Sequence, residues 1–268
     1  MKRILLTICT MSASMVLADQ TITIDGNTTT VSLAGGSNTV CNITVTESND
    51  KIEYIDGSSI NNLTTITLTI NDGKKLNISN YAKLPFKNTG KSYSTTVTLG
   101  ESSSLTLGGI LYFGTRNSDS YTGITQTTVI NMAAGSTIKA ASIETLATDA
   151  TASNSSSLTL NAALAESEIQ SIRSGSTFSR ALVTTTNGFT NYTLDNVTLG
   201  NIDALAALGM TNVGVVSSID SIGVNQYGLV MADNKLTLHV SEVPEPATAT
   251  LSLLALAGLA VRRRRRTV

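Results

Sequence analysis

The chain of 268 residues is 41% hydrophobic and only 14% charged, which is compatible with a buried core and atypical of a disordered polymer. Its formal net charge is −1, but Lys2, Arg3 and five consecutive arginines at 262–266 provide seven of the 18 basic residues. The part between these ends therefore carries about −8, which argues against a nucleic-acid partner because phosphate binding needs a basic surface. Of the two cysteines, only Cys41 lies beyond the N-terminal apolar run, which excludes an internal disulfide and a cysteine-rich metal site.

The first 18 residues have the pattern of a secretory signal peptide. Lys2 and Arg3 precede an apolar stretch from Ile4 to Val16, and the small residue Ala18 follows shortly after it. We expect signal cleavage after Ala18. The alternative is an N-terminal membrane anchor, which is disfavoured because the run is shorter than the roughly 18 to 20 apolar residues that span a bilayer.

From residue 19 to about 137, β-branched and polar residues alternate with a period of two, which predicts short β-strands. The alternating segments are TITID at 21–25, TVSLAGG at 30–36, NITVT at 42–46, TITLTIND at 65–72, TVTLG at 96–100 and LTLGG at 105–109. Turn signals occur at Asp25-Gly26, Gly35-Gly36, Asp56-Gly57, Asp72-Gly73 and Gly108-Gly109. We therefore expect strands joined by tight turns, with no long helix between them.

The predicted fold class is all-β, and a parallel β-helix or solenoid is favoured within it. Frequent serine, threonine and asparagine suit stacked ladders of like side chains, and the cadence VTLGESSSLTL at 97–107 is typical of parallel β-helices. In composition the segment resembles the repetitive passenger regions of bacterial autotransporters. No strict repeat length can be read from the sequence, and strand starts that recur at roughly 8 to 10 residues in places keep a β-sandwich as the alternative.

After residue 137 the alternation loosens and helical signals appear. SLTLNAAL at 157–164 predicts a strand that leads into a helical turn at 165–172. Ile202, Leu205 and Leu208 recur at helical spacing, which predicts a short helix that caps one end of the β-structure. QYGLVMADNKLTLHV at 226–240 predicts a final hairpin that turns at Asp233-Asn234.

The residues from 241 onward form a linker and a tail of three parts. Pro244, Glu245 and Pro246 precede a mostly apolar segment at 247–261, which predicts a membrane helix of about 22 Å at 1.5 Å per residue. That length is below the ~30 Å hydrocarbon core, but arginine side chains can extend toward the head groups. The basic cluster consists of Arg262, Arg263, Arg264, Arg265 and Arg266. Under the positive-inside rule it stays in the cytoplasm, so the body lies across the membrane from it.

This order of parts resembles the PEP-CTERM sorting signal of proteins exported by Gram-negative bacteria. The resemblance implies that the membrane transpeptidase exosortase recognises Pro244, Glu245 and Pro246, while the arginines hold the tail in the inner membrane until the chain is processed. The alternative is a simple tail anchor that the mature protein keeps. The expected organisation is a signal peptide at 1–18, an exported β-rich body at 19–240, and a linker with the sorting tail at 241–268.

The body offers few residues for catalysis. His239 is the only histidine and is expected in a plain strand position, and Cys41 is expected in the core. Nucleophile-elbow, HExxH and P-loop motifs are missing from the sequence. The acids Asp50, Glu53, Asp56, Glu166 and Glu168 lie in turn-like or helix-like segments, where solvated acids are expected. We predict no catalytic residue, no metal and no cofactor.

The sequence therefore predicts a noncatalytic exported protein of the cell envelope or extracellular matrix. The PEP-CTERM resemblance implies exopolysaccharide or another glycan as a partner, and a final location in the envelope, at the cell surface or outside the cell. A carbohydrate-binding adhesin is the first alternative. A glycan-cleaving enzyme that uses two carboxylates is the second.

Overall fold

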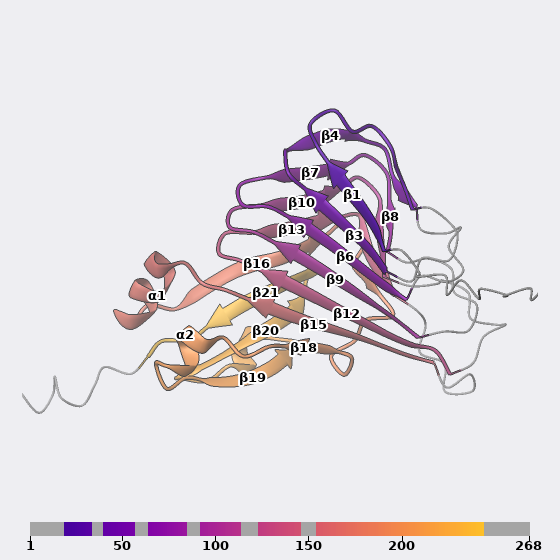
Figure 1. The fold of residues 1–268 in the computed structure, drawn as a ribbon. Helices are drawn as coiled ribbons and strands as arrows, with labels where there is room; N and C mark the ends of the chain where they lie inside the picture. Colours follow the sequence, from indigo (N-terminus) through magenta and orange to yellow (C-terminus); the bar gives the residue numbers. More distant parts are fainter. Residues whose placement is uncertain are drawn as a thin grey trace, which may run out of the picture.

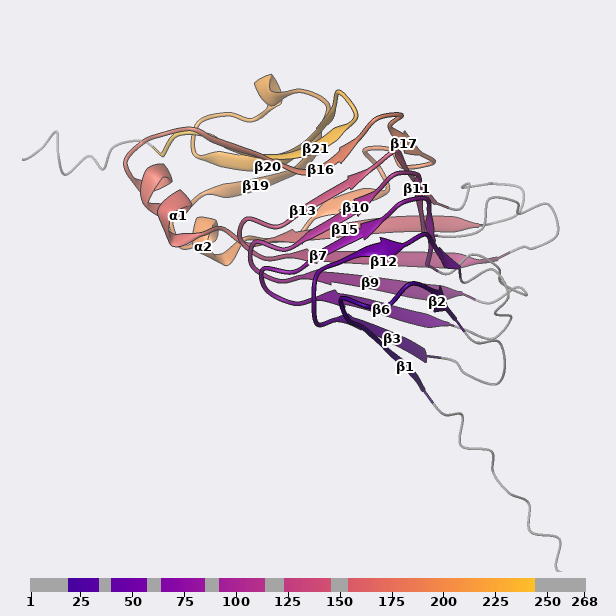
Figure 2. The same cartoon turned by 90° about the horizontal axis from the view of Figure 1, so that it is seen from above.

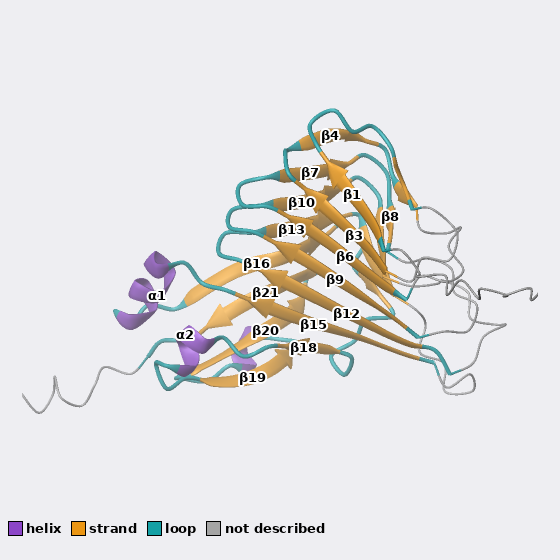
Figure 3. Cartoon of the chain, viewed as in Figure 1, coloured by secondary structure: helices purple, strands orange, loops and turns teal. Residues whose placement is uncertain are grey.

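The computed structural model describes residues 19–33, 40–56, 64–84, 92–113, 123–145 and 154–243. In these residues the chain coils into a parallel β-solenoid with three sheets (Figure 1). This confirms the predicted all-β class and the preference for a solenoid over a sandwich. Strands dominate the structure, and the two α-helices lie together at one side of it (Figure 3).

The strands fall into three sheets, which we number 1 to 3. Sheet 1 contains, in order, β1 (Gln20–Ile24), β3 (Val40–Val45), β6 (Thr65–Ile70), β9 (Tyr93–Leu99), β12 (Thr125–Met132), β15 (Ser155–Ala162) and β18 (Val197–Leu199). Sheet 2 begins with β4 (Asn49–Ile52), β7 (Lys75–Ile78), β10 (Ser104–Leu107), β13 (Thr137–Ala140) and β16 (Phe178–Thr185). Sheet 3 contains β2 (Val31–Ser32), β5 (Ile55–Asp56), β8 (Ala82–Lys83), β11 (Ile110–Phe113), β14 (Ser142–Thr145) and β17 (Phe189–Thr190).

From β3 to β17, each turn of the solenoid places one strand in sheet 1, then one in sheet 2 and one in sheet 3, as β6, β7 and β8 do. The number of residues per turn is not constant. Thr65 lies 25 positions after its partner Val40, Ser94 lies 29 after Thr65, and Thr127 lies 33 after Ser94. This variation explains why no strict repeat length is visible in the sequence.

The core fills the space between the three sheets. Along the strands of sheet 1, buried and outward residues alternate as the period of two predicts, and most of the buried residues are apolar. Ile43, Leu68 and Val97 are paired in successive turns, and each is 1% exposed or less. Stacking of like apolar side chains therefore supplies the main burial that holds neighbouring turns together.

The corner between sheets 2 and 3 depends on glycine. Between β10 and β11, Gly108 donates its backbone N–H to the carbonyl of Ile78 at 2.9 Å, which brings its Cα close to the turn before it. A Cβ at this position would overlap the carbonyl oxygen of Ser79 and lie 3.1 Å from its carbonyl carbon. Both contacts are backbone atoms, so no side-chain rotation can relieve them.

We therefore expect Gly108→Ala to lower the free energy of unfolding by about 2 kcal/mol, the usual cost of forcing extra volume into a packed region. Gly223→Ala is the matched control, because a Cβ there meets only the side chain of Gln226. Chemical denaturation of both variants tests the prediction, and equal stabilities would contradict the close backbone packing at this corner.

The C-terminal part ends the parallel stacking. In sheet 2, β21 (Lys235–Val240) pairs antiparallel with β16, and β20 (Gln226–Ala232) and β19 (Thr211–Val216) follow outward from it. The predicted hairpin is confirmed, because β20 and β21 turn at Asp233 and Asn234, whose φ angles of 49° and 59° suit a two-residue hairpin turn.

Two helices accompany this end. The helical turn predicted at 165–172 is α1 (Glu166–Arg173), which follows β15. The predicted capping helix is α2 (Asp203–Ala206), which follows the last strand of sheet 1 and buries Leu205 completely in the core. It is shorter than the spacing indicates, because Leu208 lies in the turn beyond it. In the described part of the chain no helix is long and apolar enough to cross a membrane, and the membrane helix predicted at 247–261 lies outside that part.

Candidate functional site

The predicted sorting residues lie outside the residues that the structure describes. This applies to Ala18, to Pro244, Glu245 and Pro246, and to the cluster of Arg262, Arg263, Arg264, Arg265 and Arg266. The linker before them is docked on β20. The hydroxyl of Ser241 accepts from the backbone N–H of Gln226 at 2.9 Å, and the carbonyl of Glu242 accepts from the backbone N–H of Asn225 at 3.1 Å. The folded body therefore extends to within two residues of Pro244.

The single body cysteine and the histidine occupy strand positions, as predicted. Cys41 is fully buried in β3, and burial raises the pKa of its thiol to about 11. His239 lies in β21 opposite Ser179 of β16, with 2.6 Å between its Nδ1 and the serine hydroxyl. The side chain is buried, and this desolvation lowers the pKa of the imidazole below its ordinary value of 6.5.

A lowered pKa makes stability depend on pH in a defined direction. Because the pKa of His239 is lower in the folded chain, the unfolded chain binds a proton at this residue at a higher pH than the folded chain does. The free energy of unfolding should therefore fall as the pH decreases through 6.5. In His239→Asn this component should be missing between about pH 6.5 and 5. Denaturation of both proteins across this range tests the prediction, and parallel pH profiles would contradict it.

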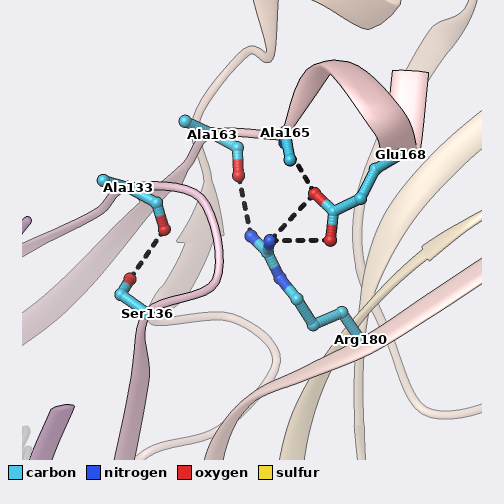
Figure 4. Close-up of polar contacts among 6 residues, drawn as sticks. All are labelled: Ala133, Ser136, Ala163, Ala165, Glu168 and Arg180. Atoms are coloured by element: carbon cyan, nitrogen blue, oxygen red, sulfur yellow. Dashed lines mark hydrogen bonds and ion pairs between the residues drawn. The ribbon is translucent and has the colours of Figure 1, made fainter. Parts of the chain in front are cut away.

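The acids considered for catalysis make structural contacts in α1. Arg180 Nη1 donates to both carboxylate oxygens of Glu168 at 3.0 Å, and its Nη2 donates to the carbonyl of Ala163 at 2.7 Å (Figure 4). Glu168 also accepts from the backbone N–H of Ala165 at 2.7 Å. Glu166 accepts from the side chain of Gln170 at 2.6 Å. Through Arg180, Glu168 holds α1 against β16 and the residue that follows β15, whereas the bond of Glu166 lies within α1.

The remaining acids of that group are separate from α1. Asp50 and Glu53 are exposed, and Asp56 accepts from the hydroxyl of Tyr81 at 3.3 Å. Among the described residues, no group of three or more His, Cys, Asp or Glu side chains is arranged to hold a metal ion.

The outer face of sheet 1 has a chemistry that the other two sheets lack. No described strand of sheet 1 contains Asp, Glu, Lys or Arg. The strand registers align its outward side chains into rows that run across the turns. One row contains Thr21, Asn42, Thr67, Thr96, Val129 and Thr159, and the next contains Thr23, Thr44, Thr69, Thr98, Asn131 and Asn161. Figures 1 and 2 show these strands side by side from β1 to β15.

Two adjoining hollows lie where the strands of sheet 1 end. One has a volume of about 290 Å³ and the other about 450 Å³. The first is lined by Thr98, Leu99, Asn131, Met132, Ala133, Asn161, Ala162 and Ala163, and the second by Thr69, Ile70, Asn71, Asp72, Thr98 and Gly100. Both include Thr98, so they adjoin at this residue, and we call the two hollows together the amide groove.

A ladder of hydrogen bonds runs along the amide groove. Asn161 Nδ2 donates to Asn131 Oδ1 at 2.8 Å, and Asn131 Nδ2 donates to Thr98 Oγ1 at 3.4 Å. The ladder fixes the orientation of the two amides relative to each other. The groove was not predicted from the sequence. Its signal in the sequence is a further polar residue two positions after an outward residue of the same strand.

A stacked pair of aromatic residues lies elsewhere. Tyr54 and Tyr81 stack with 5.6 Å between ring centroids, and Lys83 Nζ lies 4.4 Å from the centroid of Tyr81. Tyr54 precedes β5 and Tyr81 precedes β8, so this cluster belongs to sheet 3 and its edge. It is separate from the amide groove, whose lining contains no aromatic residue.

Comparison with known proteins identifies the tail. Residues 242–266 match the family model of the PEP-CTERM protein-sorting motif, and the match covers the Pro-Glu-Pro sequence and the arginine cluster. No curated protein and no solved structure matches the chain. The motif indicates export and processing by exosortase, whereas the likeness of the body to autotransporter passenger regions stays a prediction.

Proposed function

We propose that this exported PEP-CTERM protein is a noncatalytic component of the cell envelope or extracellular matrix, and that its solenoid body associates with exopolysaccharide or another glycan. The match of residues 242–266 to the sorting motif carries the proposal, because the motif implies processing by a membrane enzyme and sorting to the envelope or surface. A stiff, elongated array of strands suits a protein that must extend from the membrane into a matrix.

In this proposal each part of the chain has a separate role. The segment 1–18 directs export and is removed after Ala18, and exosortase recognises Pro244, Glu245 and Pro246. The apolar segment and the arginine cluster hold the precursor in the inner membrane during processing. Because Glu242 is still bonded to the body, exosortase meets its motif close to the folded surface.

The contacts of the body support a noncatalytic role. Glu168 is held by Arg180, Glu166 is bonded to Gln170, and His239 is buried between strands. These contacts stabilise a helix and a sheet. A carbohydrate-binding adhesin is the second candidate, and the uncharged outer face of sheet 1 with its amide groove favours it. Binding of the processed protein to a glycan array, with host and bacterial glycans compared, distinguishes the two.

Alanine at Pro244, Glu245 and Pro246 tests the proposed route. In the producing bacterium we expect this variant to accumulate as an unprocessed precursor in the inner membrane and to disappear from the matrix fraction. Thr248→Ala with Thr250→Ala is the matched control, because it changes the same tail outside the Pro-Glu-Pro sequence. Delivery of the motif variant to the matrix at the wild-type level would overturn the proposal.

A further inference from the structure

We propose that the amide groove binds a neutral glycan chain that runs along the axis of the solenoid. This inference rests on the proposed function, which names a glycan as the partner but gives it no site. The groove crosses the ends of β6, β9, β12 and β15, so it lies perpendicular to the strands and spans several turns.

The spacing of the turns suits a sugar polymer. Neighbouring strands of a sheet are about 4.8 Å apart, and a sugar unit in an extended β-linked chain has a similar length. Thr98, Asn131 and Asn161 occupy equivalent positions in three successive turns. Each can therefore meet a consecutive sugar unit in a similar way, which a binding site for a repeating polymer requires.

The amides have the hydrogen-bonding capacity for this role. An asparagine side chain has two N–H donors and a carbonyl oxygen with two lone pairs. In the ladder, Asn161 uses one donor on Asn131, and Asn131 uses one donor on Thr98. Each amide thus keeps a second donor, in an orientation that the ladder has already fixed. Sugar hydroxyls both donate and accept, so they complement such a row.

The apolar part of the lining suits the C–H face of a sugar ring. Ala133 and Ala163, which retain exposed surface, contribute apolar atoms beside the amides. The C–H groups of a pyranose ring can pack on this part while its hydroxyls face the ladder. The small alanine side chains leave room for the ring. Many carbohydrate sites have an aromatic side chain against the ring instead.

The charge of the groove selects a neutral chain. Neither Lys nor Arg lines it, so it has no partner for the carboxylates or sulfates of an acidic polysaccharide. Asp72 is the only acid in the lining, and its Oδ1 accepts from the backbone N–H of Glu101 at 2.8 Å. Apart from Asp72, the groove therefore offers its occupant uncharged polar groups and mostly apolar atoms.

Affinity electrophoresis of the processed protein from the cell envelope tests this site. The probes are the neutral fraction of the polysaccharide from the same cells and, for comparison, polygalacturonate. Asn131→Ala with Asn161→Ala removes the ladder, and Ala163→Arg fills the groove from an exposed position. The control is Thr65→Ala with Thr127→Ala, which changes outward residues of the same sheet about 13 Å from the groove. Circular dichroism verifies that every variant is folded.

We expect the wild type to be retarded by the neutral polysaccharide and not by polygalacturonate. Both groove variants should bind about tenfold more weakly or worse, while the control keeps wild-type affinity. Retardation that the groove variants leave unchanged, or a preference for polygalacturonate, would overturn the groove assignment but leave a glycan partner in place. No retardation of the wild type by the neutral polysaccharide would overturn both the groove and the glycan association of the proposed function.

Discussion

Replacing Arg180 with methionine is expected to lower the free energy of unfolding by about 3 kcal/mol. The guanidinium bonds both oxygens of Glu168 and the carbonyl of Ala163, and the two charged side chains are only 13% and 19% exposed. Methionine fills much of the same volume but leaves the carboxylate without its charged partner in a partly buried place. The loss should therefore come from an uncompensated charge, with little contribution from a cavity.

Two further variants separate this explanation from a general loss of packing. Glu168→Leu combined with Arg180→Met should recover much of the stability, because a buried pair can often be replaced by apolar side chains at small cost. Arg173→Met is the control. Its bridge to Glu166 is 3.6 Å long and at least half exposed, so its loss should cost less than about 1 kcal/mol. Urea denaturation gives all four values, and equal losses for Arg180→Met and Arg173→Met would contradict the proposed anchor.

Leu68→Asp is expected to prevent the stacking of the central turns, with a loss of more than about 4 kcal/mol. Leu68 has no exposed surface and lies in register between Ile43 and Val97 of the neighbouring turns. A carboxylate at this position would have to enter the core without a charged partner. The expected result is an unfolded or proteolysed chain, measured by circular dichroism and limited proteolysis.

The matched control lies one residue away. Thr67 points outward from β6, so Thr67→Asp should change stability by no more than about 1 kcal/mol, mostly through a lower strand propensity. Together the two variants test the alternation on which the solenoid depends. Similar losses at both positions would show that the inward and outward faces of β6 are not those described.

The sequence predicts the long strands of sheet 1 well because their two faces differ in chemistry. In β6, threonines alternate with Ile or Leu over six positions, enough for the period to be recognised. Apart from the segment at 30–36, which contains β2, the strands of sheet 3 were not predicted, for a physical reason. β5 and β8 have two residues each, and so short a strand has no period.

The contacts between distant segments could not be predicted in the same way. The bridge from Glu168 to Arg180 joins a helix to a strand across a turn, and the antiparallel pairing of β16 with β21 joins residues about 60 positions apart. The amide groove depends on which turns place Thr98, Asn131 and Asn161 side by side. Their separations of 33 and 30 residues differ, so no simple repeat reveals them.

The tail is the opposite case. Its recognition depends on a linear order of Pro-Glu-Pro, an apolar segment and arginines, and the sequence contains that order directly. For the same reason, the tail identifies the route of the protein without identifying what its body binds. The amide groove supplies a specific surface on which that second question can be tested.

The most direct measurement is the intact mass and C-terminal peptide of the protein recovered from the cell envelope and the medium. Processing by exosortase predicts a C-terminus near Pro244 to Ala247, with the arginine cluster at 262–266 missing from the mature protein. Recovery of the complete 262–268 end in the membrane fraction, with no shortened form elsewhere, would contradict the account and indicate a retained tail anchor.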